Sequence, residues 1–485
     1  MTVFRKILLN HCVGKLNLPS QKLCHTLEHL KHFQMMLGSS NVLLDDLNHF
    51  NLDWMATQKG RSKMVLLPKN TRDVASILKH CHRNNLKCVV QSGNTSLVGG
   101  SVPFDDEIII SMTKMNKILE FDEITGVLQC ETGCILQELE EFVNAKNRLI
   151  PYDLGAKGSC LIGGNLATNA GGLRFIRFGP LSAYVLGLEV VLPNGTVLDL
   201  MSTVRKDNTG YHLRHLFIGS EGTLGIMTKV SLLCPREYRH KKIFLIALES
   251  FNKLVQLFQV VQEEFAENLS LFEMMDESSM NCVLEHLSQT KSPPFRDSYP
   301  FYSLFELTSN DDKSLENRIE NFLEKTLKQS IIADGTYSGD NEKKKFDELK
   351  SFRELIPSNL TKDGHVYKYD VSLPLKVYYE LVEEIRRRLS RTPYKRICGY
   401  GHIADGNLHL NITSEKFQKE ILEIIEPFLY EFVAKYRGSI SAEHGIGVKK
   451  KSFLHYSKTP EAIELMREIK NMIDPKTILN PNVLF

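Results

Sequence analysis

Two histidines on either side of a predicted tight turn are the side chains best placed to do chemistry. His402 and His409 flank Asp405-Gly406, and a two-residue turn there would pair residue 404 with 407, 403 with 408 and 402 with 409. The two imidazoles would then face each other on one side of the sheet, with Cβ atoms about 4.5–5.5 Å apart, close enough to share a metal ion. Asn411 lies two residues further along the same face. An ordinary hairpin with two unrelated histidines is the alternative.

A second segment, residues 441–447, offers the ligand type that this hairpin lacks. Glu443 could add a carboxylate to the two imidazoles, and such a set of ligands leaves open positions on Zn²⁺, Mn²⁺ or Co²⁺, as a catalytic metal site requires. His444 could act as the general acid or base. Glu443 as a capping residue is the alternative. From the residues alone, His402, His409 and Glu443 are candidate metal ligands and His444 is a candidate catalytic residue.

Four glycine-rich segments also contain small hydroxyl residues, and they span residues 91–101, 155–159, 162–172 and 219–225. Glycines let consecutive backbone N–H groups approach an anion, and Ser or Thr adds further donors. One such segment is usually a plain turn, but four of them in one stretch of chain favour a bound dinucleotide. No GxxxxGK[ST] motif occurs, and the GxGxxA match at 399–404 runs into Asp405-Gly406 instead of opening a helix. These features disfavour P-loop and Rossmann sites.

Length and composition fit a folded protein of several domains. The 485 residues correspond to about two to four domains. Lys and Arg number 60 and Asp and Glu number 58, and a net charge of +2 is too balanced for a protein that binds phosphate backbones. The 10 cysteines include no CxxC pair, which indicates a reducing compartment. No apolar run approaches the roughly 18 residues that would span a bilayer.

The elements that must position these residues follow two different patterns. Between about 60 and 237 the sequence predicts short strands at 88–91, 107–111 and 127–132, helices at 72–84 and 135–147, and a hairpin around Asn194-Gly195. After Cys234-Pro235 a separate α+β domain begins, with Pro293-Pro294 as its plainest loop. Its predicted strands are 243–248, 270–275, 301–307, 331–337, 365–372 and 396–402, and its predicted helices are 251–266, 277–288, 313–329, 342–356 and 375–390. Helices at 416–436 and 460–473 close the chain, the second capped by Thr459 with Pro460 at its first position.

The first 27 residues contain no Asp or Glu, while basic residues alternate with apolar ones. This pattern is typical of a mitochondrial transit peptide and predicts a mitochondrial, matrix location. A merely basic, frayed terminus is the alternative.

The motifs QSGNTSLVGGS, IGGNLATNAGG and GSEGTLGI resemble the vanillyl-alcohol-oxidase type of FAD-binding domain. The resemblance implies that the first loop carries the FAD pyrophosphate and that the others wrap the adenosine and the flavin. The residues that it implies in FAD binding are Gly93, Asn94, Thr95, Gly99, Gly163, Gly164, Thr168, Asn169, Glu221, Gly222, Ile226 and Asn480. Ser92 and Ser96 stand where the family usually has glycine, and either would be strained if its backbone needed a positive φ. The loop has no His, so we expect FAD to be bound non-covalently.

The motifs GYGHIADGNLHLN and SAEHGIG resemble the paired metal motifs of FAD- and metal-dependent D-2-hydroxyacid dehydrogenases, and the resemblance covers nearly the whole chain from about residue 60. It implies oxidation of a D-2-hydroxy acid to the 2-oxo acid, with D-2-hydroxyglutarate as the expected substrate and D-lactate or glycolate as alternatives. It also implies electron-transfer flavoprotein as the electron acceptor, and a homodimer is a possible assembly.

The same resemblance implies a set of substrate contacts. Arg353 and Lys368 resemble the family's pair that binds the substrate carboxylates, a role that a guanidinium and an ammonium suit, and Asn411 and His444 complete the set. Four positions after this arginine the family usually offers a Thr donor, whereas this chain has Pro357. Proline donates nothing, and the neighbouring Ser358 could substitute for the missing donor.

The predicted fold is α+β. It combines a vanillyl-alcohol-oxidase-type FAD-binding domain of two α/β subdomains, an α+β substrate or cap domain with an antiparallel sheet, and a helical C-terminal segment that carries part of the active site. The predicted boundaries are 1–27 for the transit peptide, 59–237 for the FAD-binding domain, 238–412 for the cap domain and 413–485 for the C-terminal segment.

Two other functions use the same residues differently. A metal-dependent hydrolase could use the two histidines and the glutamate while the glycine-rich domain binds a nucleotide structurally. A catalytically inactive flavin-binding interaction protein is the third possibility, since Ser92, Ser96 and Pro357 depart from the family pattern.

Overall fold

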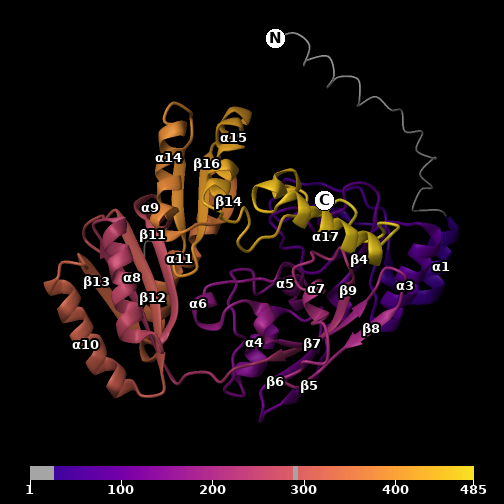
Figure 1. Cartoon of the computed structure of the whole chain (residues 1–485), viewed down its shortest axis with the longest axis horizontal. Helices are drawn as coiled ribbons and strands as arrows, with labels where there is room; N and C mark the ends of the chain where they lie inside the picture. Colours follow the sequence, from indigo (N-terminus) through magenta and orange to yellow (C-terminus); the bar gives the residue numbers. More distant parts are fainter. Residues whose placement is uncertain (1–26, 288–292) are drawn as a thin grey trace, which may run out of the picture.

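The computed structural model describes residues 27–287 and 293–485. The predicted transit peptide, residues 1–27, therefore lies almost entirely outside the described residues. Three sheets organise the rest of the chain (Figure 1). Among the described helices, none combines the length and the apolar composition that crossing a bilayer requires.

The strands of the three sheets are β1 (Val42–Leu43), β2 (Val65–Leu66), β3 (Cys88–Gln91), β4 (Ile108–Ser111), β5 (Ile118–Asp122), β6 (Val127–Glu131), β7 (Val185–Val191), β8 (Val197–Leu200), β9 (Ile226–Leu233), β10 (His240–Leu248), β11 (Leu269–Asp276), β12 (Phe301–Ser309), β13 (Asp334–Gly339), β14 (His365–Ser372), β15 (Arg396–His402) and β16 (Asn407–Ser414). The α-helices are α1 (Leu27–Leu37), α2 (Asn48–Asn51), α3 (Thr71–Asn84), α4 (Leu136–Asn144), α5 (Ile162–Thr168), α6 (Phe175–Phe178), α7 (Arg214–Phe217), α8 (Phe251–Phe265), α9 (Glu277–Leu284), α10 (Asp312–Lys328), α11 (Lys343–Glu354), α12 (Ile356–Leu360), α13 (Leu375–Tyr378), α14 (Glu380–Leu389), α15 (Lys419–Ile425), α16 (Phe428–Lys435) and α17 (Pro460–Ile473).

Two sheets build the first half of the chain. The smaller has the order β1-β2-β4-β3, with β2, β4 and β3 parallel, and it shares one apolar core with α1 and α3. Asn70 caps α3 by accepting the Asp73 N–H. The larger sheet is antiparallel, with the order β5-β6-β9-β7-β8. Its β7–β8 hairpin turns at Gly195 with φ 86°, which confirms the predicted turn.

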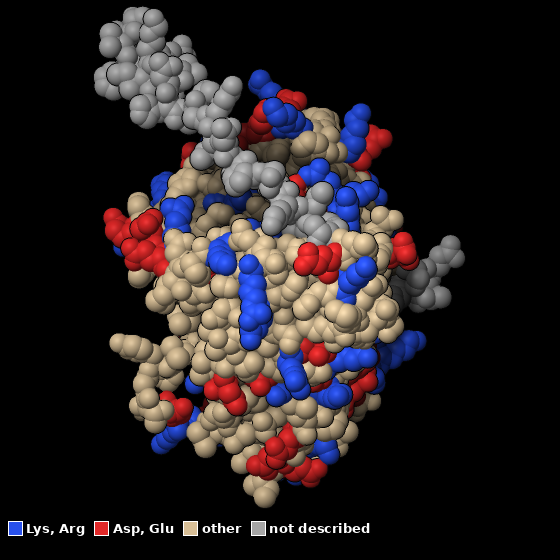
Figure 2. Space-filling view, turned by 90° about the vertical axis from the view of Figure 1, so that its right-hand side faces the viewer, with Lys and Arg blue, Asp and Glu red and all other residues tan. Residues whose placement is uncertain are grey.

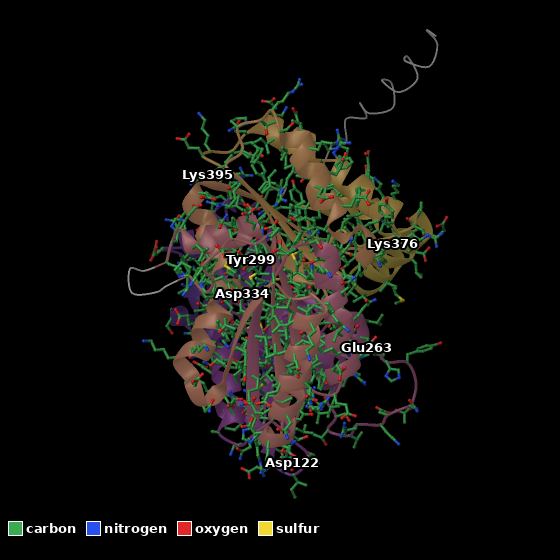
Figure 3. All side chains as sticks on the ribbon, turned by 90° about the vertical axis from the view of Figure 1, so that its left-hand side faces the viewer. Asp122, Glu263, Tyr299, Asp334, Lys376 and Lys395 are labelled. Atoms are coloured by element: carbon green, nitrogen blue, oxygen red, sulfur yellow. The ribbon has the colours of Figure 1, made fainter. Side chains whose placement is uncertain are left out.

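A seven-stranded antiparallel sheet dominates the second half, with the order β13-β10-β12-β11-β15-β16-β14. Apart from the partly exposed edge strand β13, its strands are largely buried on both faces: one face packs with α8, α10 and α14, and the other with α9, α11 and α12. Figure 3 looks at its outer side and labels Asp334 at the start of β13 and Tyr299 just before β12. The structure is thus an α+β fold with antiparallel sheets, as predicted.

The C-terminal residues return to the first half of the chain. Residue Leu479 forms a parallel bridge with Cys88 on β3, and Asn480 donates its backbone N–H to the Cys88 carbonyl at 2.9 Å. The Asn480 side chain also accepts the Val90 N–H at 3.0 Å. The preceding helix α17 packs Ile469 and Ile473 against the core of the five-stranded sheet.

Most predicted helices and strands agree with the structure to within a few residues, but two predicted single helices are each divided. The helix expected at 375–390 is α13 and α14, which are interrupted at Tyr379. The single helix expected at 416–436 is two helices, α15 and α16, which are separated at Glu426-Pro427. Pro427 has no N–H to continue the hydrogen bonding of α15, so the helix ends there. The predicted cap at Thr459 is confirmed, because its side chain accepts the Ala462 N–H.

The described cysteines and surface charges agree with the composition. All 8 cysteines among the described residues are buried and unbridged. On the face shown in Figure 2, basic and acidic side chains are interspersed, as a net charge of +2 suggests.

Candidate active site

His402 ends β15 and His409 lies on the neighbouring strand β16. In the observed register Tyr400 pairs with His409 and His402 pairs with Asn407, so the predicted pairing of 402 with 409 is wrong. The turn at 403–406 contains four residues, because Asp405 accepts the Asn407 N–H and the wider loop closes there. The register differs by two residues, so both histidines remain on one face of the sheet. Their Nε2 atoms are 3.4 Å apart.

Glu443 joins the two histidines from the loop that follows α16. Its Oε1 lies 3.4 Å from His402 Nε2, and the potential ligand atoms of His402, His409 and Glu443 all lie within 4.8 Å of one another. The three predicted ligands are therefore brought together from two strands and a loop. Glu443 lies in this loop and begins no helix, so the capping alternative is wrong.

Two of these three groups, His409 and Glu443, have the charge that suits a metal ion. Burial alone would lower the pKa of His402, but Glu273 and Glu443 raise it well above its usual range, so metal binding must displace a proton from that ring. Burial, together with the neighbouring His402, lowers the pKa of His409 to about 3, which leaves a neutral imidazole. Burial alone would raise the pKa of Glu443, but His402 outweighs it and lowers the pKa to about 2. A neutral imidazole and an ionised carboxylate are the forms that bind a divalent cation.

Asp370, which no motif singled out as a site residue, holds in place the loop that carries Glu443 and His444. It lies opposite His409 on β14, and its Oδ2 accepts the backbone N–H groups of Glu443 at 2.9 Å and His444 at 3.0 Å. Its two oxygens lie 3.6 Å from Nδ1 of His409 and Nδ1 of His444. Burial would raise the pKa of Asp370, but His444, Lys450 and His409 hold it well below its usual range.

The first half of the chain contributes directly to the same loop. The Gly172 N–H donates to Glu443 Oε1 at 2.8 Å. The Glu221 carboxylate accepts the N–H groups of Ile446 at 2.8 Å and Gly447 at 2.7 Å, and a Cβ on Gly445 would lie 2.9 Å from it. Both Glu221 oxygens are thus engaged in clamping the loop that carries Glu443 and His444.

The predicted substrate residues lie on the same face of the sheet. Arg353, in the last turn of α11, is 5% exposed and donates from Nε to Glu273 Oε2 at 2.7 Å. Its guanidinium carbon is 4.7 Å from the centroid of the Tyr400 ring, and its terminal nitrogens donate to no other group within the described residues. Those nitrogens are available to a carboxylate.

Lys368 and Asn411 are directly opposite each other on β14 and β16. Burial and the nearby Lys449 lower the pKa of Lys368 to about 8. Within the described part of the chain, its ammonium has no hydrogen-bond or ion-pair partner. A bound anion would therefore find an uncompensated cation beside Asn411.

Ser358 does not replace the donor that Pro357 lacks. Both residues lie in the short helix α12. The Ser358 hydroxyl donates to the Leu355 carbonyl at 3.0 Å, and the side chain is exposed. The position that the family usually fills with a Thr donor therefore has no hydroxyl in this chain.

The glycine-rich loops converge in the first half of the molecule. A Cβ on Gly93 would lie 2.1 Å from the Ser159 carbonyl oxygen, and one on Gly164 would lie 3.1 Å from the Ser92 side chain. The chain adopts a positive φ at Asn94 and Gly99, with values of 52° and 74°, and Ser92 and Ser96 do not share it. The two serines therefore avoid the strain that their position suggested.

Family models match both halves of the chain. A model of the FAD binding domain matches residues 62–201, and a model of FAD linked oxidases, C-terminal domain, matches residues 237–484. The chain belongs to the FAD-linked oxidases.

Curated relatives of this FAD-linked oxidase match over most of their length. It is 48% identical over 455 residues to "D-2-hydroxyglutarate dehydrogenase, mitochondrial" of Arabidopsis thaliana. The alignment covers 93% of this chain and 80% of the relative. The protein of the same name from Danio rerio is 46% identical over 457 residues, covering 94% and 85%. A "Putative D-lactate dehydrogenase C713.03, mitochondrial" of Schizosaccharomyces pombe is 42% identical over 468 residues, covering 93% and 88%.

Solved structures share the fold at low identity. A p-cresol methylhydroxylase with substrate bound superposes with a TM-score of 0.74 at 15% identity, covering 93% of this chain and 95% of that one. An alkyldihydroxyacetonephosphate synthase gives a TM-score of 0.72 at 17% identity, covering 94% and 85%. These likenesses support the fold of this FAD-linked oxidase and nothing further.

The residues of this oxidase fit a bound FAD. Within the described residues, the backbone N–H groups of 93–97 donate to no protein group, so a run of donors is free for a pyrophosphate. Some predicted FAD residues instead support the loops with their side chains. The Asn94 amide donates to the His49 and Leu52 carbonyls, and the Asn480 amide donates to the Glu221 carbonyl at 2.7 Å.

The remaining predicted FAD residues lie around this loop. Asn169 ends α5 and accepts the Ser182 N–H at 3.1 Å, and a Cβ on Gly219 would lie 3.6 Å from its side chain. A Cβ on Gly222 would lie 2.7 Å from the Asn480 amide. Three others lie on or at the start of regular elements: Gly163 and Thr168 on α5, and Ile226 at the start of β9.

Proposed function

We propose that this chain is an FAD-dependent dehydrogenase that oxidises D-2-hydroxyglutarate to 2-oxoglutarate with the help of a divalent metal. The observation that supports the proposal is that His402, His409 and Glu443 have potential metal-ligand atoms close together, beside His444 and the available guanidinium of Arg353, on one face of one sheet. A 2-hydroxy dicarboxylate needs both a metal and a separate cation, since its two carboxylates are at opposite ends. The names of the Arabidopsis and Danio relatives support the same substrate.

His402, His409 and Glu443 would hold the metal, with Zn²⁺ as the first candidate and Mn²⁺ or Co²⁺ as alternatives. When bound, the metal would lower the pKa of the substrate's 2-hydroxyl, and FAD would take the hydride from C2. Arg353 would bind the distal carboxylate, and Lys368 and Asn411 would orient the substrate beside it. His444 would accept the hydroxyl proton, and Asp370 would hold the His444 backbone in place for that transfer.

Several features of the cellular setting belong to the same proposal. The relatives have mitochondrial names, and the acid-free, basic first 27 residues fit a transit peptide, so we place the protein in the mitochondrial matrix. The acceptor of its electrons would be electron-transfer flavoprotein, FAD would be bound non-covalently, and the chain would form a homodimer. The proposed division of the chain is a FAD-binding domain at 59–237, a cap domain at 238–412 and a C-terminal segment at 413–485.

The purified protein should be yellow, and anaerobic addition of D-2-hydroxyglutarate should bleach its flavin absorption. Bleaching by D-2-hydroxyglutarate should be faster than bleaching by D-lactate, and the L-enantiomer serves as the control. A colourless protein without releasable FAD would instead favour the hydrolase alternative. Faster bleaching of the flavin by D-lactate than by D-2-hydroxyglutarate would favour a D-lactate dehydrogenase, the second candidate function.

That second candidate, a D-lactate dehydrogenase, is kept because of Pro357 and the name of the S. pombe relative. A distal pocket without a hydroxyl donor suits a monocarboxylate better than a dicarboxylate.

Replacing Pro357 with threonine should lower KM for D-2-hydroxyglutarate and leave KM for D-lactate unchanged. One neutral hydrogen bond is worth about 0.5–1.5 kcal/mol, so the decrease should be about two- to tenfold. Steady-state kinetics with an artificial electron acceptor measures it. Ser358→Ala is the matched control and should change neither KM, because its hydroxyl already bonds the Leu355 carbonyl. An unchanged KM in Pro357→Thr would mean that the distal carboxylate lies elsewhere.

A further inference from the structure

Glu273 is a charged residue in the middle of an otherwise mostly apolar buried strand. It lies on β11, and its side chain is 0% exposed. A buried carboxylate is costly unless it is paired and hydrogen-bonded. In the register of the sheet it stands directly opposite His402 on β15.

Each oxygen of Glu273 contacts a different functional group. Oε1 bonds Nδ1 of His402, which leaves Nε2 of that ring facing Glu443 and His409. Oε2 accepts the Nε–H of Arg353 at 2.7 Å, which leaves the terminal nitrogens of the guanidinium for a ligand. One carboxylate therefore fixes the orientation of a metal ligand and of the predicted substrate-binding arginine at once.

The surroundings of Arg353 leave it few other ways to be held. Its guanidinium lies over the Tyr400 ring, and the Tyr400 hydroxyl in turn accepts the Asn411 amide at 2.6 Å. Aromatic stacking restricts the plane of the guanidinium, but the bond to Glu273 determines which of its nitrogens point toward the site.

We propose that Glu273 is a positioning residue that couples the metal ligand His402 to the carboxylate-binding Arg353. This inference rests on the proposed function. Metal affinity and selectivity for dicarboxylates depend on the same side chain, so a change at Glu273 reduces both. Carboxylates that bond metal-ligating histidines typically change metal affinity by about 10- to 100-fold when removed.

The test is Glu273→Gln in the FAD-containing protein. A glutamine has one acceptor oxygen and cannot accept from both His402 and Arg353. Competition for Zn²⁺ against a chromophoric chelator should show affinity lowered about 10- to 100-fold. In the zinc-loaded enzyme, the ratio of kcat/KM for D-2-hydroxyglutarate over that for D-lactate should fall about tenfold or more, because Arg353 loses its orientation. Zinc affinity within about twofold of the wild type, or an unchanged ratio, would overturn the proposal.

Glu306 offers a matched control. It is a buried glutamate, 1% exposed, on the adjacent strand β12 of the same sheet, and it bonds neither His402 nor Arg353. Glu306→Gln should leave zinc affinity and substrate ratio unchanged. Equal losses in both variants would show that any buried carboxylate change disturbs the sheet and would overturn the specific role of Glu273.

Two further variants keep the test decisive. Glu273→Asp retains the charge but withdraws it by one methylene, so it should give intermediate losses. An aspartate variant with wild-type zinc affinity and a wild-type substrate ratio overturns the proposal even if the glutamine variant does not fold.

In an Arg353→Met background, Glu273→Gln should still weaken zinc binding but lower the substrate ratio no further. If the wild-type protein fails to oxidise D-2-hydroxyglutarate, the proposed function fails, while zinc competition still decides whether Glu273 orients His402.

Discussion

Replacing His409 with alanine should lower kcat/KM for D-2-hydroxyglutarate by about a hundred- to a thousandfold and leave the FAD content unchanged. His409 is one of three proposed ligands whose potential ligand atoms lie within 4.8 Å of one another. A metal that polarises the reacting group supplies several kcal/mol of transition-state stabilisation, and each 1.4 kcal/mol equals about tenfold in rate. The glycine-rich loops lie in the first half of the chain and do not use this side chain. Steady-state kinetics and the absorbance of released flavin measure the two quantities.

His365→Ala is the control, because His365 begins β14 at the end distant from Asp370 and contacts only Tyr367 and Phe417 among aromatic rings. It should leave the rate unchanged. Removal of metal by a chelator should imitate His409→Ala in the wild type, and Zn²⁺, Mn²⁺ or Co²⁺ should restore the rate. A dialysed, metal-free enzyme with full kcat contradicts the metal role, and loss of flavin in His409→Ala would make the residue structural.

Replacing Arg353 with methionine should lower kcat/KM for D-2-hydroxyglutarate at least tenfold more than kcat/KM for D-lactate. The terminal nitrogens of Arg353 are free for the distal carboxylate, and one lost charge-assisted hydrogen bond is worth roughly 1.5–3 kcal/mol. D-Lactate has no distal carboxylate to lose. Steady-state kinetics on both substrates with one enzyme preparation measures the ratio of the two kcat/KM values. Any loss of active protein lowers both values equally and does not change this ratio.

The same substitution should also destabilise the fold, because it leaves one oxygen of the buried Glu273 unpaired. Breaking a buried ion pair costs about 3–5 kcal/mol, which a thermal unfolding experiment would detect. Arg353→Lys is the control for charge, since it keeps a cation but cannot hold Glu273 and a carboxylate in the same planar geometry. Equal losses on both substrates would place Arg353 at the C1 carboxylate or in the scaffold.

Local sequence signals predicted the parts of this molecule that depend on local geometry. Counting outward from the predicted turn placed His402, His409 and Asn411 on one sheet face, which is correct although the pairing was not. The glycine-rich segments predicted close backbone approach, and Gly93 and Gly164 do lie close to neighbouring loops. Glu443 was a candidate because a carboxylate was the ligand type that the hairpin lacked, and the resemblance to the family strengthened it; no periodicity could give its position.

The remaining features depend on contacts between distant segments. In the β15–β16 hairpin the Asn407 N–H donates to the Asp405 carboxylate, and the loop has four residues. Counting residues outward from Asp405-Gly406 could not distinguish this loop from a two-residue turn. Glu273 lies 129 residues before His402, and it was a lone acid in a predicted apolar strand, which was the only signal available. Asp370 and Glu221 engage backbone N–H groups, which the sequence does not identify.

The return of the C-terminal residues to β3 bears on how the chain folds as it is synthesised. Val90 and Asn480, which hydrogen-bond to each other, are 390 residues apart. At roughly 5–20 residues per second, the ribosome delivers the second about 20–80 s after the first. During that time β3 in the smallest sheet lacks its parallel bridge to Leu479. The Glu221 carbonyl also lacks the hydrogen bond that it accepts from the Asn480 amide. The FAD-binding half of the chain therefore stays incomplete until translation ends, and chaperone dependence should be strongest for chains truncated before Leu479 and Asn480.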